Sequence, residues 1–271
     1  MSHFPCAVIS DGTKTIEELM APYQENNMET VDEKYLKFFD ETAEYRKKYE
    51  EETIFFCYDP KDEEGPILYP RWHDVRKTYE KDSLGIEVKR YVTPEGWVDV
   101  TLPYKTVFPT FEDFMLNIYG DEPNEDGRYG YWENPNARWD WYSEYGPTSW
   151  VRDYIGGNPI RLGDIMFDPD KEEARARRFL IEHPADTDGL ERYWAMRDMT
   201  EEQYVESERH LNFWSCITPD GEWHEAAEMY AFGVSEDVGG DAHYKWALEF
   251  KEMFIDPYPD YYVMTVLNCH I

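Results

Sequence analysis

Residues 134–142 read NPNARWDWY and place one Arg and one Asp among three aromatic side chains. The face of a Trp ring stacks on nucleobases and on cations. In a strand, the two Trp residues would share one face and the Asp between them would point to the other. The Arg would then contact a phosphate, while the Asp holds a ribose hydroxyl or orients the Arg. The candidate binding residues of this segment are Arg138, Trp139, Asp140, Trp141 and Tyr142.

The same segment also has a purely structural interpretation. A Trp side chain is usually mostly buried, and its ring N–H takes one hydrogen-bond partner. In that case Trp139 and Trp141 anchor the core, while Arg138 and Asp140 pair locally. A deep pocket lined by these side chains would support the binding interpretation, and burial of both Trp rings in apolar core would oppose it.

Histidines form a second group with possible chemistry. The sequence HEAAE begins at His224, but the zinc-protease pattern needs a second His where Glu228 stands. We therefore predict no metal site there and keep His224 and Glu225 as candidate binding residues. His3 and His270 each adjoin a predicted strand, and their imidazoles meet if those strands are neighbours. We predict no catalytic residue, no metal and no cofactor.

The charge of the chain is strongly unbalanced. It has 58 acidic and 27 basic residues, which gives a net charge of -31. Such a surface repels nucleic acid and anionic membranes and attracts basic proteins. One interpretation is a bias toward solubility. The other is mimicry of nucleic acid, because a duplex carries roughly one negative charge per 1.7 Å of its axis.

Two segments concentrate the acidic residues. Residues 112–126 hold six acidic residues and no basic one, and residues 219–241 hold seven and no basic one. They matter for function only if they adjoin in the fold as one broad patch. A basic group on a predicted helix, from Lys171 to Arg178, is expected to pair with nearby acids. The acidic candidate binding residues are Asp113, Asp121, Glu122, Glu125 and Asp126.

The order of predicted elements indicates an α+β fold. Strands and helices are mixed without strict βαβ alternation. We expect a mixed, mainly antiparallel sheet with the N- and C-terminal strands inside it, flanked by several helices. We expect one compact domain over residues 1–271, with an irregular excursion around residues 59–85. The hydrophobic fraction of 41% and the aromatic fraction of 17% indicate a chain that folds despite its charge.

Local signals place the elements. Thr15 with Glu18, and Thr200 with Gln203, have the spacing of capping boxes at helix starts. Helical spacing of apolar residues predicts a helix from Glu33 to Tyr49. A strand, a Pro-Glu-Gly turn and a second strand are predicted within residues 86–107. The remaining predicted strands cover 3–10, 52–59, 211–218, 222–233 and 261–271. The remaining predicted helices cover 111–119, 170–183 and 241–255, with one or two more helices within 188–209.

The four cysteines lie far apart and form no CxxC pair, so neither a zinc ribbon nor a thioredoxin-type site is predicted. We expect buried free thiols in a reducing cytosol. The N-terminus lacks the basic and apolar regions of a signal peptide. No apolar stretch approaches the roughly 20 residues of a membrane span.

Four stretches together resemble one family: MSHF…AVIS, NPNARWDWY, TPDGEWHE and VLNCHI. The chain is similar over its full length to a group of proteins encoded by bacteriophages and their hosts. It departs from that group where SEYGPTSW replaces a Gly-Gly-Arg-Trp run, and where Asn268 stands in place of Asp. The resemblance implies a phage protein in the cytoplasm of an infected bacterium and assigns no catalytic residue.

Two functional hypotheses follow. The first is a binding protein, not an enzyme, that inhibits a host defence or nucleic-acid-handling protein by covering its basic surface with an acidic, nucleic-acid-mimicking one. The alternative is a pocket protein that sequesters or processes a nucleotide-like small molecule through Trp139, Asp140, Trp141, His224 and His270. A housekeeping phage protein whose acidity serves solubility is a third possibility.

Overall fold

The structure is a computed structural model that describes residues 3–26, 31–61, 69–70, 77–81, 87–185, 189–227 and 238–271. The chain forms two compact units. The first unit comprises Met1–Lys37 and Glu133–Ile271, and the second comprises Phe38–Trp132. A single compact domain over residues 1–271 stays a prediction.

A six-stranded sheet forms the centre of the first unit. Its order is β10-β13-β1-β11-β12, and β9 also pairs with β13. Only β1 and β11 run parallel among these pairs. The N- and C-terminal strands lie inside the sheet, which confirms the predicted α+β fold. The strands are β1 (His3–Ser10), β9 (Trp141–Glu144), β10 (Ile160–Arg161), β11 (Ser215–Ile217), β12 (Trp223–Glu225) and β13 (Val263–His270).

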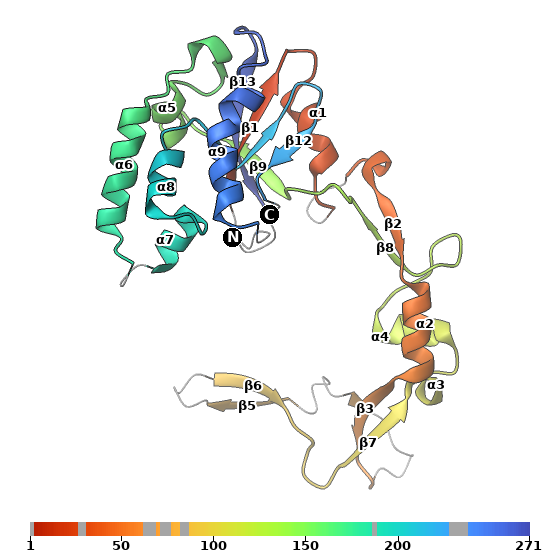
Figure 1. Cartoon of the computed structure of the whole chain (residues 1–271). Helices are drawn as coiled ribbons and strands as arrows, with labels where there is room; N and C mark the ends of the chain where they lie inside the picture. Colours follow the sequence, from red (N-terminus) through yellow and green to blue (C-terminus); the bar gives the residue numbers. More distant parts are fainter. Residues whose placement is uncertain are drawn as a thin grey trace. The chain divides into compact units, whose positions relative to one another are not determined.

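Helices cover both faces of this sheet. Both predicted capping boxes are present, at Thr15 with Glu18 and at Thr200 with Gln203. In Figure 1, α6, α7 and α8 gather beside α9. The helices are α1 (Ile16–Met20), α5 (Trp150–Ile155), α6 (Pro169–Glu182), α7 (Gly189–Met196), α8 (Glu201–Ser207) and α9 (Gly240–Phe254), with 3-10 turns η1 (Ala21–Tyr23), η2 (Glu33–Tyr35) and η4 (Leu162–Asp164).

The two faces of β1 belong to different core clusters. Ala7 and Ile9 pack with Phe250 of α9, and Cys6 and Val8 pack with the cluster that includes α1. Alternate residues of a strand point to opposite faces, so a strand covered on both sides is apolar at every position. This explains why all four residues of CAVI, at positions 6–9, are apolar.

In its described residues, the second unit combines short sheets with three helices. Phe111, Phe114, Met115 and Tyr129 form its buried cluster. Thr110 caps the helix that carries the first three of these residues: its hydroxyl accepts the N–H of Asp113. The elements are α2 (Thr42–Glu51), α3 (Tyr104–Val107), α4 (Phe111–Ile118), β2 (Lys37–Asp40), β3 (Thr53–Tyr58), β4 (Tyr69–Pro70), β5 (Lys77–Lys81), β6 (Glu87–Tyr91), β7 (Val98–Pro103) and β8 (Gly130–Glu133).

The predicted helix from Glu33 to Tyr49 is wrong in its first half. Phe38 and Phe39 lie in β2, which pairs with β8. Their rings contact Trp132 and Tyr131 of β8, at centroid distances of 5.4 and 5.6 Å. The carboxylate of Asp40 then accepts the N–H of Thr42 at 3.0 Å, and α2 begins there. Packing of these aromatic rings across the two strands favours a strand here more strongly than the helical spacing of the apolar residues favours a helix.

The predicted strands within residues 86–107 form, but they do not pair with each other. Strand β6 pairs with β5, and β7 pairs with β3. The second strand ends at Pro103, where α3 begins. Strands β4 and β5 lie in the excursion predicted to be irregular at residues 59–85, so that prediction is wrong at these positions. Residues 62–68, 71–76 and 82–86 of the excursion lie outside the described residues.

Two predicted strands near the C-terminal end are shorter than expected. Strand β11 covers only Ser215–Ile217, and β12 covers Trp223–Glu225. The two pair antiparallel, as the PDG turn between them predicts. Most of the rest of the predicted second strand, residues 228–233, lies outside the described residues.

Candidate functional site

The two Trp residues of NPNARWDWY do not share one face. Trp139 is 6% exposed and donates its ring N–H to the carbonyl of Met20 at 3.2 Å. Trp141 is 38% exposed and begins β9. Trp139 precedes the strand and forms an isolated bridge with Gln24, so strand alternation does not extend to it. The expectation that both rings line one side is therefore wrong, and Trp139 is a core anchor.

Arg138 pairs with Glu225 and not with Asp140. Its Nε lies 2.9 Å from Oε1 of Glu225, while the ring N–H of Trp223 donates to Oε2 at 2.9 Å. The side chain of Glu225 is 13% exposed and that of Arg138 is 25% exposed. Both oxygens of this carboxylate therefore have a partner, and the ion pair fastens the NPNARWDWY segment to β12.

Asp140 bonds to His270. Its Oδ1 lies 2.6 Å from Nδ1 of His270 and also accepts the N–H of Trp141 at 2.7 Å. His3 is the register partner of His270, and their ring centroids lie 5.1 Å apart. The two imidazoles thus meet, as expected for neighbouring strands. Nε2 of His270 is buried and has no hydrogen-bond partner among the described residues.

His224 and Glu225 serve different sides of β12. Nε2 of His224 lies 3.3 Å from the hydroxyl of Thr218, and its ring packs on Phe254 of α9 at 5.0 Å. Glu225 instead contacts Arg138. Neighbouring strand residues point to opposite faces, so these two candidates do not meet at one ligand.

A cavity of about 450 Å³ lies beside the NPNARWDWY segment. It brings together four of the predicted residues, Trp139, Asp140, Trp141 and Tyr142, with Glu17, Ala21 and Gln24. Neither His224 nor His270 lines it. Two of its polar groups are bonded within the protein: Asp140 to His270, and the ring N–H of Trp139 to Met20.

The predicted acidic residues lie on α4 and the loop after it, in the second unit. They are Asp113, Asp121, Glu122, Glu125 and Asp126, of which Asp126 pairs with Arg128 at 2.6 Å. The other acidic segment, residues 219–241, belongs to the first unit, and its residues 228–237 lie outside the described residues. No single patch that contains both segments is therefore described.

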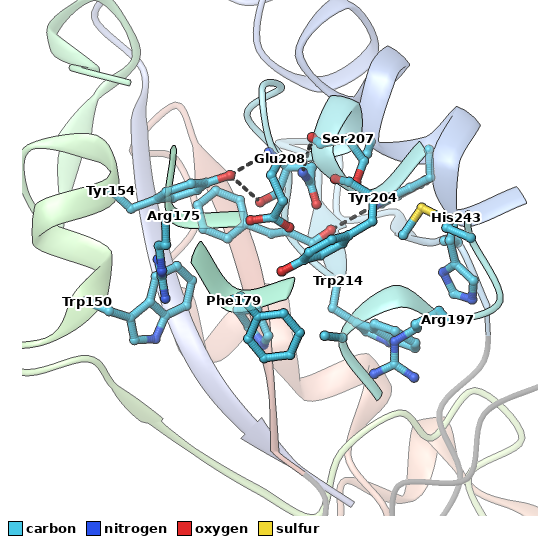
Figure 2. Close-up of a pocket in the computed structure, with 18 residues that line it drawn as sticks. Trp150, Tyr154, Arg175, Phe179, Arg197, Tyr204, Ser207, Glu208, Trp214 and His243 are labelled. Carbon is cyan, nitrogen blue, oxygen red and sulfur yellow. Dashed lines mark hydrogen bonds between the residues drawn. The ribbon is translucent and has the colours of Figure 1, made fainter. Parts of the chain in front are cut away.

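A second cavity, which we call the aromatic pocket, has a volume of about 470 Å³ and lies in the first unit (Figure 2). Its walls come from α5, α6, α8, α9 and the residues before β11. Its charged or ionisable lining residues are Arg175, Arg197, Glu208 and His243, and its aromatic lining residues are Trp150, Tyr154, Phe179, Tyr204, Phe213, Trp214 and Trp246.

Helical spacing explains how these side chains converge. Positions four residues apart lie on the same face of a helix. Trp150 and Tyr154 have this spacing on α5, and Arg175 and Phe179 have it on α6. Tyr204 lies on α8, and Glu208 follows at the C-cap of that helix. Three helices therefore each direct a pair of side chains into the same space.

Glu208 is the acidic group of the pocket. Burial raises the pKa of its carboxyl to about 7, while nearby Arg175 acts in the opposite direction and Glu172 adds to the rise. Arg175 is itself engaged, with its guanidinium 3.3 Å from Oε2 of Glu172. Among the described residues, the carboxyl of Glu208 has no hydrogen bond and no ion pair.

Arg197 is fixed at another part of the pocket wall. Its guanidinium lies 4.0 Å above the ring of Trp214. Burial lowers its pKa to about 10, so it remains a cation at neutral pH. Arg197 and Asp198 have φ angles of 47° and 64°, a left-handed conformation that is uncommon for residues other than Gly. Such backbone strain is concentrated at functional sites.

His243 lies beside the same Trp ring, with the two ring centroids 5.4 Å apart. Burial and the charge of Arg197 lower its pKa to about 4, so its imidazole is neutral at neutral pH. The ring N–H of Trp214 is buried and has no hydrogen-bond partner among the described residues. In Figure 2, Arg197, Trp214 and His243 lie together, away from Tyr154 and Glu208.

The sequence analysis missed this pocket. Apart from Pro5, its residues come from separate stretches between 150 and 247, and of these the prediction covers only the basic group on α6. The expected pairing of that group with nearby acids is confirmed by Arg175 with Glu172 and by Arg177 with Glu173. The aromatic pairs at helical spacing were the available signal, but the same spacing also describes ordinary core packing.

Comparisons of this chain with protein-family models, with curated proteins and with solved structures give no match. In the described part of the chain, no three His, Cys, Asp or Glu residues cluster as metal ligands would. Within the same residues, no helix has the length and apolar character needed to cross a bilayer. The four cysteines are buried free thiols, as expected.

Proposed function

We propose that the first unit binds a nucleotide-like small molecule in the aromatic pocket. A flat ring stacks against the aromatic walls, and the cationic Arg197 takes an anionic group of the ligand. The observation that carries this proposal is the carboxyl of Glu208, which lies in an aromatic-lined cavity without a hydrogen bond or ion pair among the described residues. Glu208 is half-buried and lines the cavity, so a ligand in the cavity would supply a partner for its carboxyl.

The size and lining of the pocket support the proposal. Its volume of about 470 Å³ falls within the roughly 300–1,000 Å³ typical of small-molecule sites, which combine apolar walls with a few polar groups. Stacking of a base on an aromatic side chain is worth about 1–3 kcal/mol. Seven aromatic residues line this pocket, so more than one stacking contact is available.

The local charge of the pocket differs from the charge of the whole chain. The net charge of -31 disfavours anions at long range. Salt screens exposed charges beyond about 8 Å at physiological ionic strength. Arg175 and Arg197 both line the pocket, so an anion that enters meets two guanidinium groups at close range.

Titration calorimetry of the full chain with purine and pyrimidine nucleoside monophosphates tests this function. We expect saturable binding to the wild type and at least tenfold weaker binding to Phe179→Ala, which removes one stacking wall. Trp141→Ala is the matched control, because Trp141 is a partly exposed aromatic residue outside the pocket. Absence of binding for every nucleotide, with no small molecule released on denaturing the purified protein, would overturn the proposal.

A second candidate function is the acidic inhibitor of a basic host defence or nucleic-acid-handling protein. The observation that favours it lies in the second unit: Glu112, Glu122 and Glu125 are exposed and have no ion pair among the described residues. Exposed Tyr119 and Trp132 of that unit are suited to anchoring contacts. A phage origin and a host cytoplasmic location, which the family resemblance implies, belong to this proposal.

A salt gradient separates this candidate from nonspecific adhesion. A partner held by electrostatic complementarity is captured rapidly at low salt and leaves at moderate salt. Lysine substitution at Glu112, Glu122 and Glu125 should abolish capture. A partner retained unchanged at high salt, or captured equally by the substituted protein, contradicts an acidic interface.

A further inference from the structure

The hydrogen bonds around Glu208 specify more than a generic ligand. The hydroxyl of Tyr154 accepts the backbone N–H of Asn212 at 3.2 Å and lies 3.4 Å from the carbonyl of the same residue. The side-chain amide of Asn212 donates to the carbonyl of His210 at 2.9 Å. The hydroxyl of Ser207 donates to the carbonyl of Tyr204 at 2.8 Å. Tyr154, Asn212 and Ser207 are thus hydrogen-bonded within the protein, whereas no hydrogen bond of the Tyr204 hydroxyl is described.

Glu208 is therefore an open hydrogen-bond acceptor at this part of the pocket. Above its pKa of about 7 the carboxyl of Glu208 is ionised. An ionised carboxylate only accepts, and its two oxygens match two parallel N–H donors. We infer that the ligand presents two adjacent N–H donors on a flat ring, as the Watson–Crick edge of guanine does, and that Glu208 recognises this edge. This inference rests on the proposed function and names the class of base.

The other bases fit this acceptor less well. The corresponding edge of adenine combines one amino donor with a ring-nitrogen acceptor, and that of cytosine places a carbonyl beside them. Uracil has a single ring N–H between two carbonyls. Each of these edges would direct an acceptor toward a carboxylate oxygen, which leaves a buried oxygen without a partner and costs binding energy.

An organic cation is disfavoured by the same lining. Aromatic walls with a carboxylate attract ammonium groups, but Arg175 and Arg197 line this pocket as well. A fixed positive charge would be repelled by both guanidinium groups. A neutral guanine ring avoids this repulsion, and its phosphate is complementary to Arg197, which is held over Trp214.

The test is calorimetry of the full chain with GMP, IMP, AMP and UMP, and with tetramethylammonium as a cationic probe. IMP equals GMP without the exocyclic amino group, so it retains one of the two donors. We expect GMP to bind most tightly and IMP at least tenfold more weakly. Glu208→Gln should remove the preference for GMP over IMP while both still bind through stacking. Circular dichroism confirms that the variant is folded.

Glu202→Gln is the matched control, because Glu202 lies exposed on the same helix and outside the pocket. It should keep the GMP preference of the wild type. Equal binding of GMP, IMP and AMP would overturn the guanine inference and leave the proposed function in place. Binding of tetramethylammonium alone would also overturn it. Absence of binding for all five probes would remove the proposed function itself.

Discussion

The NPNARWDWY segment and the aromatic pocket contain similar types of side chain but differ in whether their acidic groups have partners. Each combines several aromatic rings with an Arg and an acid. In the segment, Glu225 binds both Arg138 and Trp223, and Asp140 binds His270. In the pocket, the carboxyl of Glu208 has no partner among the described residues. Polar groups that bond to each other stabilise the fold, whereas a polar group without a partner is available to a ligand.

This difference shows that composition does not identify a binding site. The segment attracts attention because its residues are adjacent in sequence. The pocket residues include pairs of positions on three helices, the loop at Arg197 with its left-handed backbone, and the residues before β11. No single stretch of sequence therefore stands out. What distinguishes the two regions is whether the acidic side chain has a partner, and this can be tested by substituting matched residues.

The largest expected effect concerns Trp139. Trp139→Ala should lower the free energy of unfolding by roughly 3–5 kcal/mol, the usual cost of removing a buried large aromatic side chain. Trp141→Ala, two residues away and partly exposed, should cost less than about half of that. Urea denaturation of both variants measures the difference. Equal losses would show that the segment is not divided into a core ring and a surface ring.

The second prediction concerns the pH dependence that Glu208 causes. Its folded pKa of about 7 lies above the ordinary value of 4.5, so the folded state binds this proton more tightly than the unfolded state. The resulting stabilisation is complete below pH 4.5 and is lost as the pH rises through 7. The loss is on the order of 2–3 kcal/mol.

Glu208→Gln should remove this contribution and make the protein more stable than the wild type at pH 8. Neutral Gln cannot become charged in the pocket, where Arg175, Arg197, His243 and Glu172 are the surrounding charged or ionisable groups. Urea denaturation at pH 5 and pH 8 gives the comparison. A variant that loses stability with pH as steeply as the wild type would assign the effect to another group.

The third prediction applies the same substitution to the satisfied carboxylate. Glu225→Gln should destabilise the protein by about 1–2 kcal/mol at pH 8, because Arg138 loses its charged partner and hydrogen bonds to charged groups are worth about 1.5–3 kcal/mol. The sign is thus opposite to that of Glu208→Gln at the same pH. If both substitutions change stability in the same direction, pairing does not separate the two regions.

Much of the fold was predictable because its signals are local or periodic. The capping boxes at Thr15 and Thr200 and the apolar strand His3–Ser10 depend on neighbours within a few residues. The segment from Lys37 to Asp40 was mistaken for helix because its partner strand lies about ninety residues away in β8. Pairing between strands so far apart in the sequence produces no pattern within a short stretch of either strand.

The candidate site was harder to predict than the fold for the same reason. The meeting of His3 and His270 could be expected, since both adjoin strong strands. Nothing near Arg138 in sequence indicates Glu225 as its partner, and nothing near Glu208 indicates that its carboxyl lacks one. Whether a charge is satisfied is decided by tertiary contacts across α5, α6, α8 and α9.

The smallest expected effect on stability concerns Arg197, where two contributions oppose each other. Arg197→Gly relieves a φ of 47°, which is worth roughly 1 kcal/mol because Gly adopts this conformation freely. It also removes the guanidinium from Trp214, a contact worth about 0.5–1 kcal/mol. We expect a net change in unfolding free energy below about 1 kcal/mol, together with a tenfold or greater loss of nucleotide affinity.

Arg177→Gly on exposed α6 is the comparison, because it should reduce helix stability by roughly 1 kcal/mol and leave affinity unchanged. Unaltered affinity in Arg197→Gly would mean that this strained residue serves the fold and not a ligand.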